Sequence, residues 1–145
     1  MSDRPSIGWI GTGVMGAPMA GHLLDAGYEL TVFNRTAARA DDLVARGARR
    51  ADGPSAVAAG ADIVVTMVGF PADVRSTILG ADGALAAMTP GALIIDMTTS
   101  EPTLATEIHA AAAARHVAAL DAPVSGGDLG ARNAALVIMV GGEPE

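Results

Sequence analysis

The sequence predicts an α/β fold, a single domain built around a doubly wound, mostly parallel β-sheet. The length of 145 residues is typical of one domain with a substantial core. Short apolar runs alternate with helical patterns along the whole chain, which is typical of β-α-β units. Several of these runs are continuous in Val, Ile and Leu, as expected for strands that helices cover on both faces.

Six apolar runs are predicted to form the strands, and we expect the sheet to continue to the end of the chain. These runs are Ile7–Ile10, Leu30–Phe33, Ile63–Val68, Leu93–Ile95, Val117–Leu120 and Leu136–Val140. Ala48–Ala51 can add a short edge strand, although its arginines argue against one.

The predicted helices lie between these strands. In the first, Met15, Met19 and Leu23 fall on one helical face together with His22, and Gly27 ends the helix. Three further helices are predicted from capping signals. The first of these starts at Thr36 and is closed by Gly47, the second starts at Ser55 and is closed by Gly60, and the third runs from Pro102 to Arg115.

A glycine motif joins the first strand to the first helix. It reads Gly11-Thr12-Gly13-Val14-Met15-Gly16. Gly11 permits a tight turn out of the strand, Gly13 lets the backbone approach a pyrophosphate closely, and Gly16 lets the helix pack against the sheet. Three glycines in an ordinary loop are the alternative. The position between a strand and a helix favours a Rossmann-type dinucleotide-binding site, with the phosphates at the N-terminus of the helix.

The end of the second strand bears on the choice between NAD and NADP. NAD-selective sites place an acidic residue there for the ribose 2′-hydroxyl, but this chain continues as Asn34-Arg35-Thr36. The guanidinium of Arg35 can bind a 2′-phosphate, and Asn34 and Thr36 can add neutral hydrogen bonds. The sequence therefore favours NADP over NAD, with a merely solvated Arg35 as the alternative.

Composition excludes several classes of partner. The net charge is −7, all nine basic residues are arginine, and no basic stripe is present, so we expect no nucleic-acid partner. No apolar run approaches the roughly 20 residues of a membrane span, and the start lacks a signal-peptide pattern. No histidine pair has the spacing of metal ligands, so no metal is expected. A cytoplasmic protein is the expectation, with which the absence of cysteine is compatible.

Three segments together resemble the β-hydroxyacid dehydrogenases, the group of 3-hydroxyisobutyrate dehydrogenase, tartronate semialdehyde reductase and relatives of 6-phosphogluconate dehydrogenase. They are Ile7–Ala20, Asp96-Met97-Thr98-Thr99-Ser100-Glu101-Pro102, and Asp121-Ala122-Pro123-Val124-Ser125-Gly126-Gly127 followed by Ile138–Gly142. The third segment is much more specific than the glycine motif. The resemblance covers essentially the whole chain and implies oxidation of a β-hydroxyacid to its semialdehyde, or the reverse, with NADP or NAD.

The resemblance also implies roles for single residues. Thr99 would contact the cofactor, although Thr98, Thr99 or Ser100 could instead cap the next helix. Val68-Gly69 stands where the family has an apolar residue followed by Pro, so it would also contact cofactor; here the proline is displaced to Pro71.

A substrate site is implied at Ser125-Gly126-Gly127, which offers a hydroxyl and two unobstructed N–H groups to a carboxylate, unless it is a simple glycine turn. Just beyond it the family's Gly-Thr-Leu is replaced by Ala134-Ala135-Leu136. This departure leaves the finer choice of substrate open.

The family's general acid is a lysine in a helical domain that follows the cofactor domain. This chain ends at Glu145 and contains no lysine, so the resemblance places that lysine beyond Glu145. His22, His109 and His116 do not look like substitutes. We therefore expect no catalytic residue in this chain, a cofactor-binding fragment with negligible turnover, and a homo-oligomer for the full-length form.

Two alternatives to this interpretation stay open. One is a stand-alone NADP(H)-binding module without catalysis. The other is an imine-reductase-like enzyme, against which the segment Asp121–Gly127 argues because it suits the carboxylate of a hydroxyacid.

Overall fold

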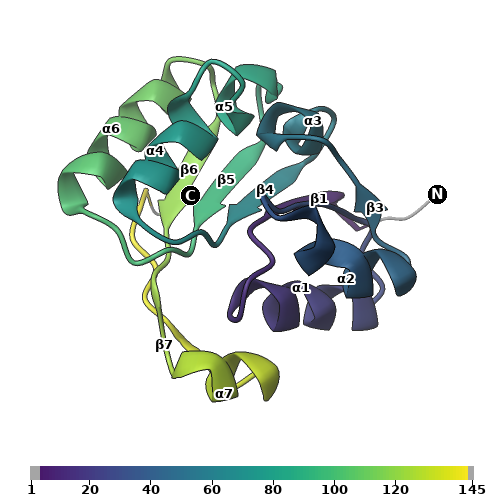
Figure 1. Cartoon of the computed structure of the whole chain (residues 1–145). Coiled ribbons are helices and arrows are strands. Elements are labelled where there is room, and N and C mark those ends of the chain that lie inside the picture. Colours follow the sequence, from purple (N-terminus) through teal and green to yellow (C-terminus); the bar gives the residue numbers. More distant parts are fainter. Residues whose placement is uncertain (1–3, 144–145) are drawn as a thin grey trace.

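The computed structural model describes residues 4–143, and its main element is a six-stranded parallel sheet (Figure 1). The strand order is β3-β2-β1-β4-β5-β6, so the chain starts at the centre, runs to one edge and then crosses to the other half. The strands are β1 (Ile7–Ile10), β2 (Leu30–Phe33), β3 (Arg49–Arg50), β4 (Ile63–Thr66), β5 (Leu93–Asp96) and β6 (Ala118–Asp121). This order confirms the predicted doubly wound α/β fold of Rossmann type.

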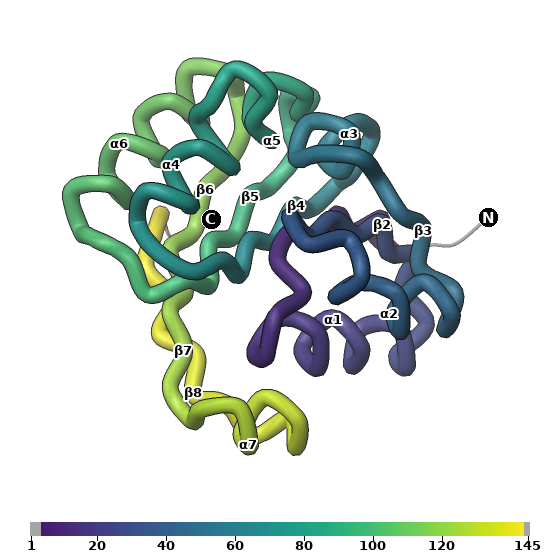
Figure 2. Tube along the Cα trace, viewed as in Figure 1, coloured from purple at the N-terminus to yellow at the C-terminus, as the bar shows by residue number. Residues whose placement is uncertain are grey.

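Helices cover both faces of this sheet (Figures 1 and 2). One face carries α1 (Gly16–Asp25) and α2 (Asp41–Ala45), the latter preceded by the 3₁₀ helix η1 (Ala37–Ala40). The other face carries α3 (Pro54–Ala58), α4 (Pro71–Leu79), α5 (Ala84–Ala87) and α6 (Pro102–Ala113).

A separate hydrophobic core lies between the sheet and each helix layer, because successive strand residues point to opposite faces. In β1, Ile7 and Trp9 pack in the core under α1 and α2, whereas Ile10 packs in the core under α3 to α6. All four β1 residues are buried, as expected for a central strand of a parallel sheet.

Most predicted element bounds agree with the structure. β1 and β2 begin and end at the predicted residues, and the edge strand near Ala48–Ala51 is present as β3, whose arginines are exposed. Pro102 lies in the first turn of α6, as predicted.

Several predicted caps are wrong. α3 begins at Pro54 after Gly53, so Ser55 lies inside the helix. Thr36 does occupy the N-cap position of η1, which α2 follows directly as far as Ala45, but its side chain makes no capping hydrogen bond. Glu101 occupies the N-cap position of α6, so neither the two threonines nor Ser100 caps that helix.

The prediction that the sheet continues to the end of the chain is also wrong. Residues 124–138 form a C-terminal arm instead, which consists of β7 (Val124–Ser125), α7 (Gly127–Arg132) and β8 (Val137–Ile138). The two arm strands pair antiparallel in a separate small sheet, and Figures 1 and 2 show the arm hanging from the main sheet. A parallel pairing requires a long crossover, but here the chain turns back through one short helix.

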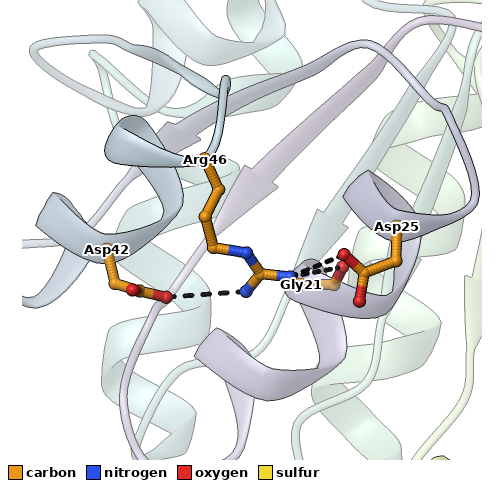
Figure 3. A network of polar contacts seen from close by, with 4 residues as sticks. All are labelled: Gly21, Asp25, Asp42 and Arg46. Carbon is orange, nitrogen blue, oxygen red and sulfur yellow. Dashed lines mark hydrogen bonds and ion pairs between the residues drawn. The ribbon is translucent and has the colours of Figure 1, made fainter.

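A polar network joins α1 to the end of α2 (Figure 3). The guanidinium of Arg46 donates to Asp25 at 2.8 Å, to the carbonyl oxygen of Gly21 at 3.3 Å and to Asp42 at 3.5 Å. A Cβ at Gly21 would lie 2.7 Å from a guanidinium nitrogen, so glycine leaves room for this contact. The network fixes the helix that follows the glycine motif against its neighbour.

Candidate functional site

A cavity of about 620 Å³ lies at the carboxyl ends of β1, β2 and β4. This is the point where the strand order reverses, the usual ligand-binding place in open α/β sheets. Most of the residues predicted to bind cofactor line this cavity. They are Gly11, Gly13, Val14, Met15, Gly16, Asn34, Arg35, Thr36, Val68 and Gly69.

The glycine motif forms a tight turn held by its neighbours. Gly11 has a φ of 103°, which favours glycine, and the Trp9 indole N–H donates to the Gly11 carbonyl oxygen at 2.8 Å. A Cβ at Gly16 would collide with that same oxygen, so Gly16 is required for the close packing of α1. Gly13 differs from both, because a Cβ there would meet nothing within 4 Å and would project into open space.

The first turn of α1 is available to a ligand. Met15 stands at the N-cap, no side chain caps the helix, and no acidic residue lies in its first turn. A helix start leaves backbone N–H groups without intrahelical partners and carries partial positive charge. The open space at Gly13 and this helix start together fit the phosphates of a dinucleotide.

Asn34 holds the turn at the end of β2 to the glycine motif. Its side-chain oxygen accepts a hydrogen bond from the N–H of Thr12 at 2.8 Å, and its amide N–H donates to the carbonyl oxygen of Thr36 at 2.9 Å. Thr12 is buried and does not line the cavity. Asn34 therefore fixes the shape of the site in addition to lining it.

Arg35 and Arg39 are both exposed cations of the cavity, and Arg35 faces a carboxylate that was not predicted. Its Nη1 lies 3.5 Å from Oδ1 of Asp73, and 88% of its side chain is exposed. Oδ2 of Asp73 accepts a hydrogen bond from the N–H of Phe70 at 3.0 Å, at the start of α4. Other lining residues that were not predicted as site residues are Ile10, Phe33, Arg39, Pro54, Met67, Phe70, Ser76 and Thr77.

A signal for Asp73 does exist in the sequence. Pro71 and Asp73 stand at the first and third positions of α4, the places that proline and an acidic residue favour at a helix start. This pattern predicts a helix after β4, but it does not predict the contact with Arg35, which lies 38 positions earlier.

Thr98, and not Thr99, joins the loops after β4 and β5. The Thr98 hydroxyl accepts a hydrogen bond from the N–H of Val68 at 3.0 Å, and its own N–H donates to Asp96 at 3.1 Å. The Thr66 hydroxyl also donates to Asp96, at 2.9 Å. Thr99 is exposed and does not line the cavity.

Asp96 and Asp121 lie side by side in register at the ends of β5 and β6. Burial raises the pKa of Asp96; hydrogen bonds from Thr98 and Thr66 oppose this rise, and the charge of Asp121 adds to it. Burial also raises the pKa of Asp121. These carboxylates are therefore easier to protonate than exposed ones.

The predicted substrate residues Ser125, Gly126 and Gly127 lie in the C-terminal arm. All three are exposed, and none of them lines the 620 Å³ cavity. Gly126 and Gly127 have φ values of 134° and 62°, so they form the turn that begins α7.

The histidines show no arrangement typical of catalysis. Nε2 of His22 lies 2.7 Å from the carbonyl oxygen of Ala131, which ties α1 to α7. His109 lies 4.0 Å from Glu143, and His116 is exposed. Residues 4–143 contain no group of three His, Cys, Asp or Glu side chains that could hold a metal ion. In the same range, no helix is both long and apolar enough to cross a bilayer.

The predicted general acid has no counterpart in the structure. The lysine is expected beyond Glu145, and Glu145 itself lies outside the residues that the structure describes. The expectation of a lysine beyond Glu145 therefore stays a prediction.

Similarity to known proteins extends over nearly the whole chain. Over 142 residues it is 54% identical to "Probable 3-hydroxyisobutyrate dehydrogenase-like 1, mitochondrial" of Arabidopsis thaliana, and the match covers 97% of this chain and 42% of the relative. The chain thus spans less than half the length of that relative.

Solved structures show the same relation. A 3-hydroxyisobutyrate dehydrogenase of Mycobacterium tuberculosis with L-serine is 38% identical with a TM-score of 0.90, over 97% of this chain and 47% of that one. Psf3 in complex with NADP+ is 32% identical with a TM-score of 0.89, over 95% of this chain and 49% of that one. A reductive aminase of Aspergillus terreus is less similar, at 29% identity with a TM-score of 0.79, over 96% of this chain and 48% of that one.

The family model for the NAD binding domain of 6-phosphogluconate dehydrogenase matches residues 6–145. This match includes every strand and helix described above. The chain therefore belongs to the family of NAD-binding domains typified by that of 6-phosphogluconate dehydrogenase.

Proposed function

We propose that this chain is the cofactor-binding part of an NADP-dependent oxidoreductase that interconverts a β-hydroxyacid and its semialdehyde. The observation that carries the proposal is the cavity in which Gly13, the uncapped start of α1 and the cation of Arg35 lie together. The nicotinamide ring of a bound cofactor supplies or accepts the hydride. This chain's residues bind and orient that cofactor.

Each part of the proposed site would bind a different part of the cofactor or the substrate. The turn Gly11–Gly16 would hold the pyrophosphate against the start of α1, with Thr12 fixing the turn through Asn34. Arg35, Asn34 and Thr36 would receive the adenosine ribose and its 2′-phosphate. Val68-Gly69 and Thr99 would contact the nicotinamide half, and Ser125-Gly126-Gly127 would bind the substrate carboxylate.

A preference for NADP over NAD is supported by the absence of an acid at the end of β2 and by the exposure of Arg35. NADP+ in the similar protein Psf3 supports the same choice.

The substrate class is supported by the names of the relatives. Three plant relatives that are 54%, 51% and 49% identical are named for 3-hydroxyisobutyrate dehydrogenase, and L-serine, itself a β-hydroxyacid, is present with the mycobacterial enzyme. The less similar reductive aminase gives weaker support to an imine-reducing activity. The alternative that is not an enzyme is a stand-alone NADP(H)-binding module.

The longer protein would form a homo-oligomer in the cytoplasm, although the names of plant relatives include the word mitochondrial.

The cofactor assignment is tested by titrating the 145-residue chain with NADPH and NADH and following the quenching of Trp9 or the emission of the nicotinamide. Arg35→Ala should weaken NADPH binding about tenfold, since a charge-assisted hydrogen bond is lost, and should change NADH less than about twofold. Gly13→Val should weaken both cofactors, because its side chain would project into the open space beside the helix start. Equal effects of Arg35→Ala on both cofactors would remove Arg35 from 2′-phosphate recognition.

The catalytic assignment predicts binding without turnover for this chain. By the family resemblance a lysine donates the proton, and the 145 residues contain none, so its place is expected beyond Glu145. Incubation of the chain with NADPH and a β-semialdehyde should therefore leave the absorbance of NADPH unchanged, and rapid oxidation of NADPH would contradict the assignment.

A further inference from the structure

The carboxylate of Asp73 lies in the wall of the cavity next to the cation that is expected to choose the cofactor. Both Asp73 and Arg35 line the cavity, and their closest side-chain atoms are 3.5 Å apart. The two residues come from different elements: Arg35 follows β2, and Asp73 lies in the first turn of α4. A carboxylate from another part of the chain thus lies beside the end of β2.

The two side chains differ in freedom. The Asp73 side chain is 27% exposed, and one of its oxygens accepts the backbone hydrogen bond from Phe70 that caps α4. Movement of this carboxylate would cost the cap. The Arg35 side chain is 88% exposed, so it can turn toward another anion at little cost. Asp73 is the fixed partner of the pair and Arg35 the adjustable one.

A 2′-phosphate would bring close to two negative charges to the same guanidinium. Arg35 would then have to leave Asp73 or be shared between two anions that repel each other. NADH has a hydroxyl at this place and does not require Arg35 to move.

From this geometry, and resting on the proposed function, we infer that Asp73 is a specificity-determining residue that competes with the cofactor 2′-phosphate for Arg35. It reduces the preference for NADPH and keeps NADH an acceptable cofactor. The proposed site would then accept both cofactors, with the balance set by an ion pair between β2 and α4.

The test is Asp73→Asn in the 145-residue chain, with Kd measured for NADPH and NADH. Asparagine keeps an oxygen that can accept the Phe70 N–H and removes the charge. NADPH should bind about three- to fivefold tighter, the range expected for release of an exposed ion pair, and NADH should change less than about twofold. In the Arg35→Ala background the same substitution should change NADPH binding less than about twofold, because the guanidinium that pairs with Asp73 is gone.

Glu107→Gln is the matched control. It also removes one negative charge and one ion pair, here between α6 and α4, since Glu107 binds Arg75 at 2.7 Å, but neither residue lines the cavity. The ratio of the two dissociation constants should not change in this variant. Circular dichroism and a thermal melt show that each variant is folded.

The outcomes separate the inference from the proposed function. Wild-type chain that binds neither cofactor would overturn both. If the wild type binds NADPH, weaker NADPH binding by Asp73→Asn would show that Asp73 orients Arg35 for the phosphate. If Asp73→Asn changes the Kd of both cofactors equally, Asp73 only caps α4. If Asp73→Asn tightens NADPH binding as much in the Arg35→Ala background as in the wild type, Asp73 repels the phosphate directly. Each of these three results would overturn the competition while leaving the cofactor assignment in place.

Discussion

The glycine turn before α1 and the C-terminal arm use glycine and apolar residues in opposite ways. In the turn, Gly11 and Gly16 are buried and closely packed, and the strand before them is fully buried. In the arm, Gly126 and Gly127 are exposed, and apolar side chains face solvent. Those side chains are Leu129 at 60% exposed, Val137 at 62% and Ile138 at 49%.

This difference shows which part of the proposed site has its geometry fixed by contacts within the main sheet. The wall of the proposed cofactor cavity is held by the sheet and by hydrogen bonds such as that from the N–H of Thr12 to the side-chain oxygen of Asn34. The proposed substrate turn in the arm is attached to α1 through α7, where Ala131 is buried and its carbonyl oxygen contacts His22. Substitutions in the first region should therefore affect folding of the whole chain, and those in the second should act locally.

The largest effect is expected from Gly16→Ala. The new Cβ would collide with the Gly11 carbonyl oxygen, a backbone atom that also accepts the Trp9 hydrogen bond. Because backbone must move, we expect a loss of about 3 kcal/mol or more, enough to unfold a domain of ordinary stability. Urea denaturation followed by Trp9 fluorescence measures it.

Gly13→Ala is the matched control, with the same substitution three positions earlier. Its Cβ would meet nothing within 4 Å, so its midpoint should stay close to that of the wild type. Equal destabilisation of the two variants would show that the turn is not packed as described.

The same contrast explains how far sequence reasoning reached. β1 and β2 were predicted to the residue because short apolar runs that alternate with helical patterns are typical of strands in β-α-β units, and β1 also ends at the glycine turn. The run Leu136–Val140 is also apolar, yet only Val137–Ile138 is a strand, and it lies in the arm. Composition alone does not show whether an apolar run is covered by helices. Most residues that the sequence predicts to bind cofactor line the cavity, but the pair of Arg35 and Asp73 depends on how two distant helix starts meet.

A second, smaller effect is expected at the border between sheet and arm, at Asp96. Its backbone oxygen accepts from the N–H of Ala122, where the chain leaves β6, and its side chain accepts from Thr66 and Thr98. Asp96→Ala leaves a buried N–H and a buried hydroxyl without this acceptor, which costs about 2–3 kcal/mol. Asp96→Asn keeps an acceptor, so its urea midpoint should lie much closer to that of the wild type.

The pH dependence of Asp96→Asn sharpens the same prediction. The pKa of Asp96 is raised above its ordinary 3.8, so between 3.8 and the raised value the folded state binds more protons than the unfolded state. The contribution of this group to stability therefore falls as pH rises through that window. Asp96→Asn should show a shallower fall over the same pH range. The slope of the free energy of unfolding against pH should not vanish in this variant, because the pKa of Asp121 is raised too. An unchanged slope would show that Asp96 does not titrate in this window.

The smallest effect on the whole chain is expected from Ala131→Glu in the arm. Ala131 is fully buried against the core under α1, so a glutamate there would bring an unpaired charge into an apolar contact. The arm can avoid this cost by detaching α7 and losing the short contact between Ala131 and His22. The main sheet does not depend on that contact, so its free energy of unfolding should fall by only about 1 kcal/mol. Hydrogen exchange should show the separation directly: amides of α7 should exchange much faster, while those of β1 and β4 stay protected. Ala135→Glu adds the same charge at an exposed position of the arm and should leave both sets unchanged. Loss of protection in β1 by Ala131→Glu would show that arm and sheet unfold together, and the contrast between the two regions would then be wrong.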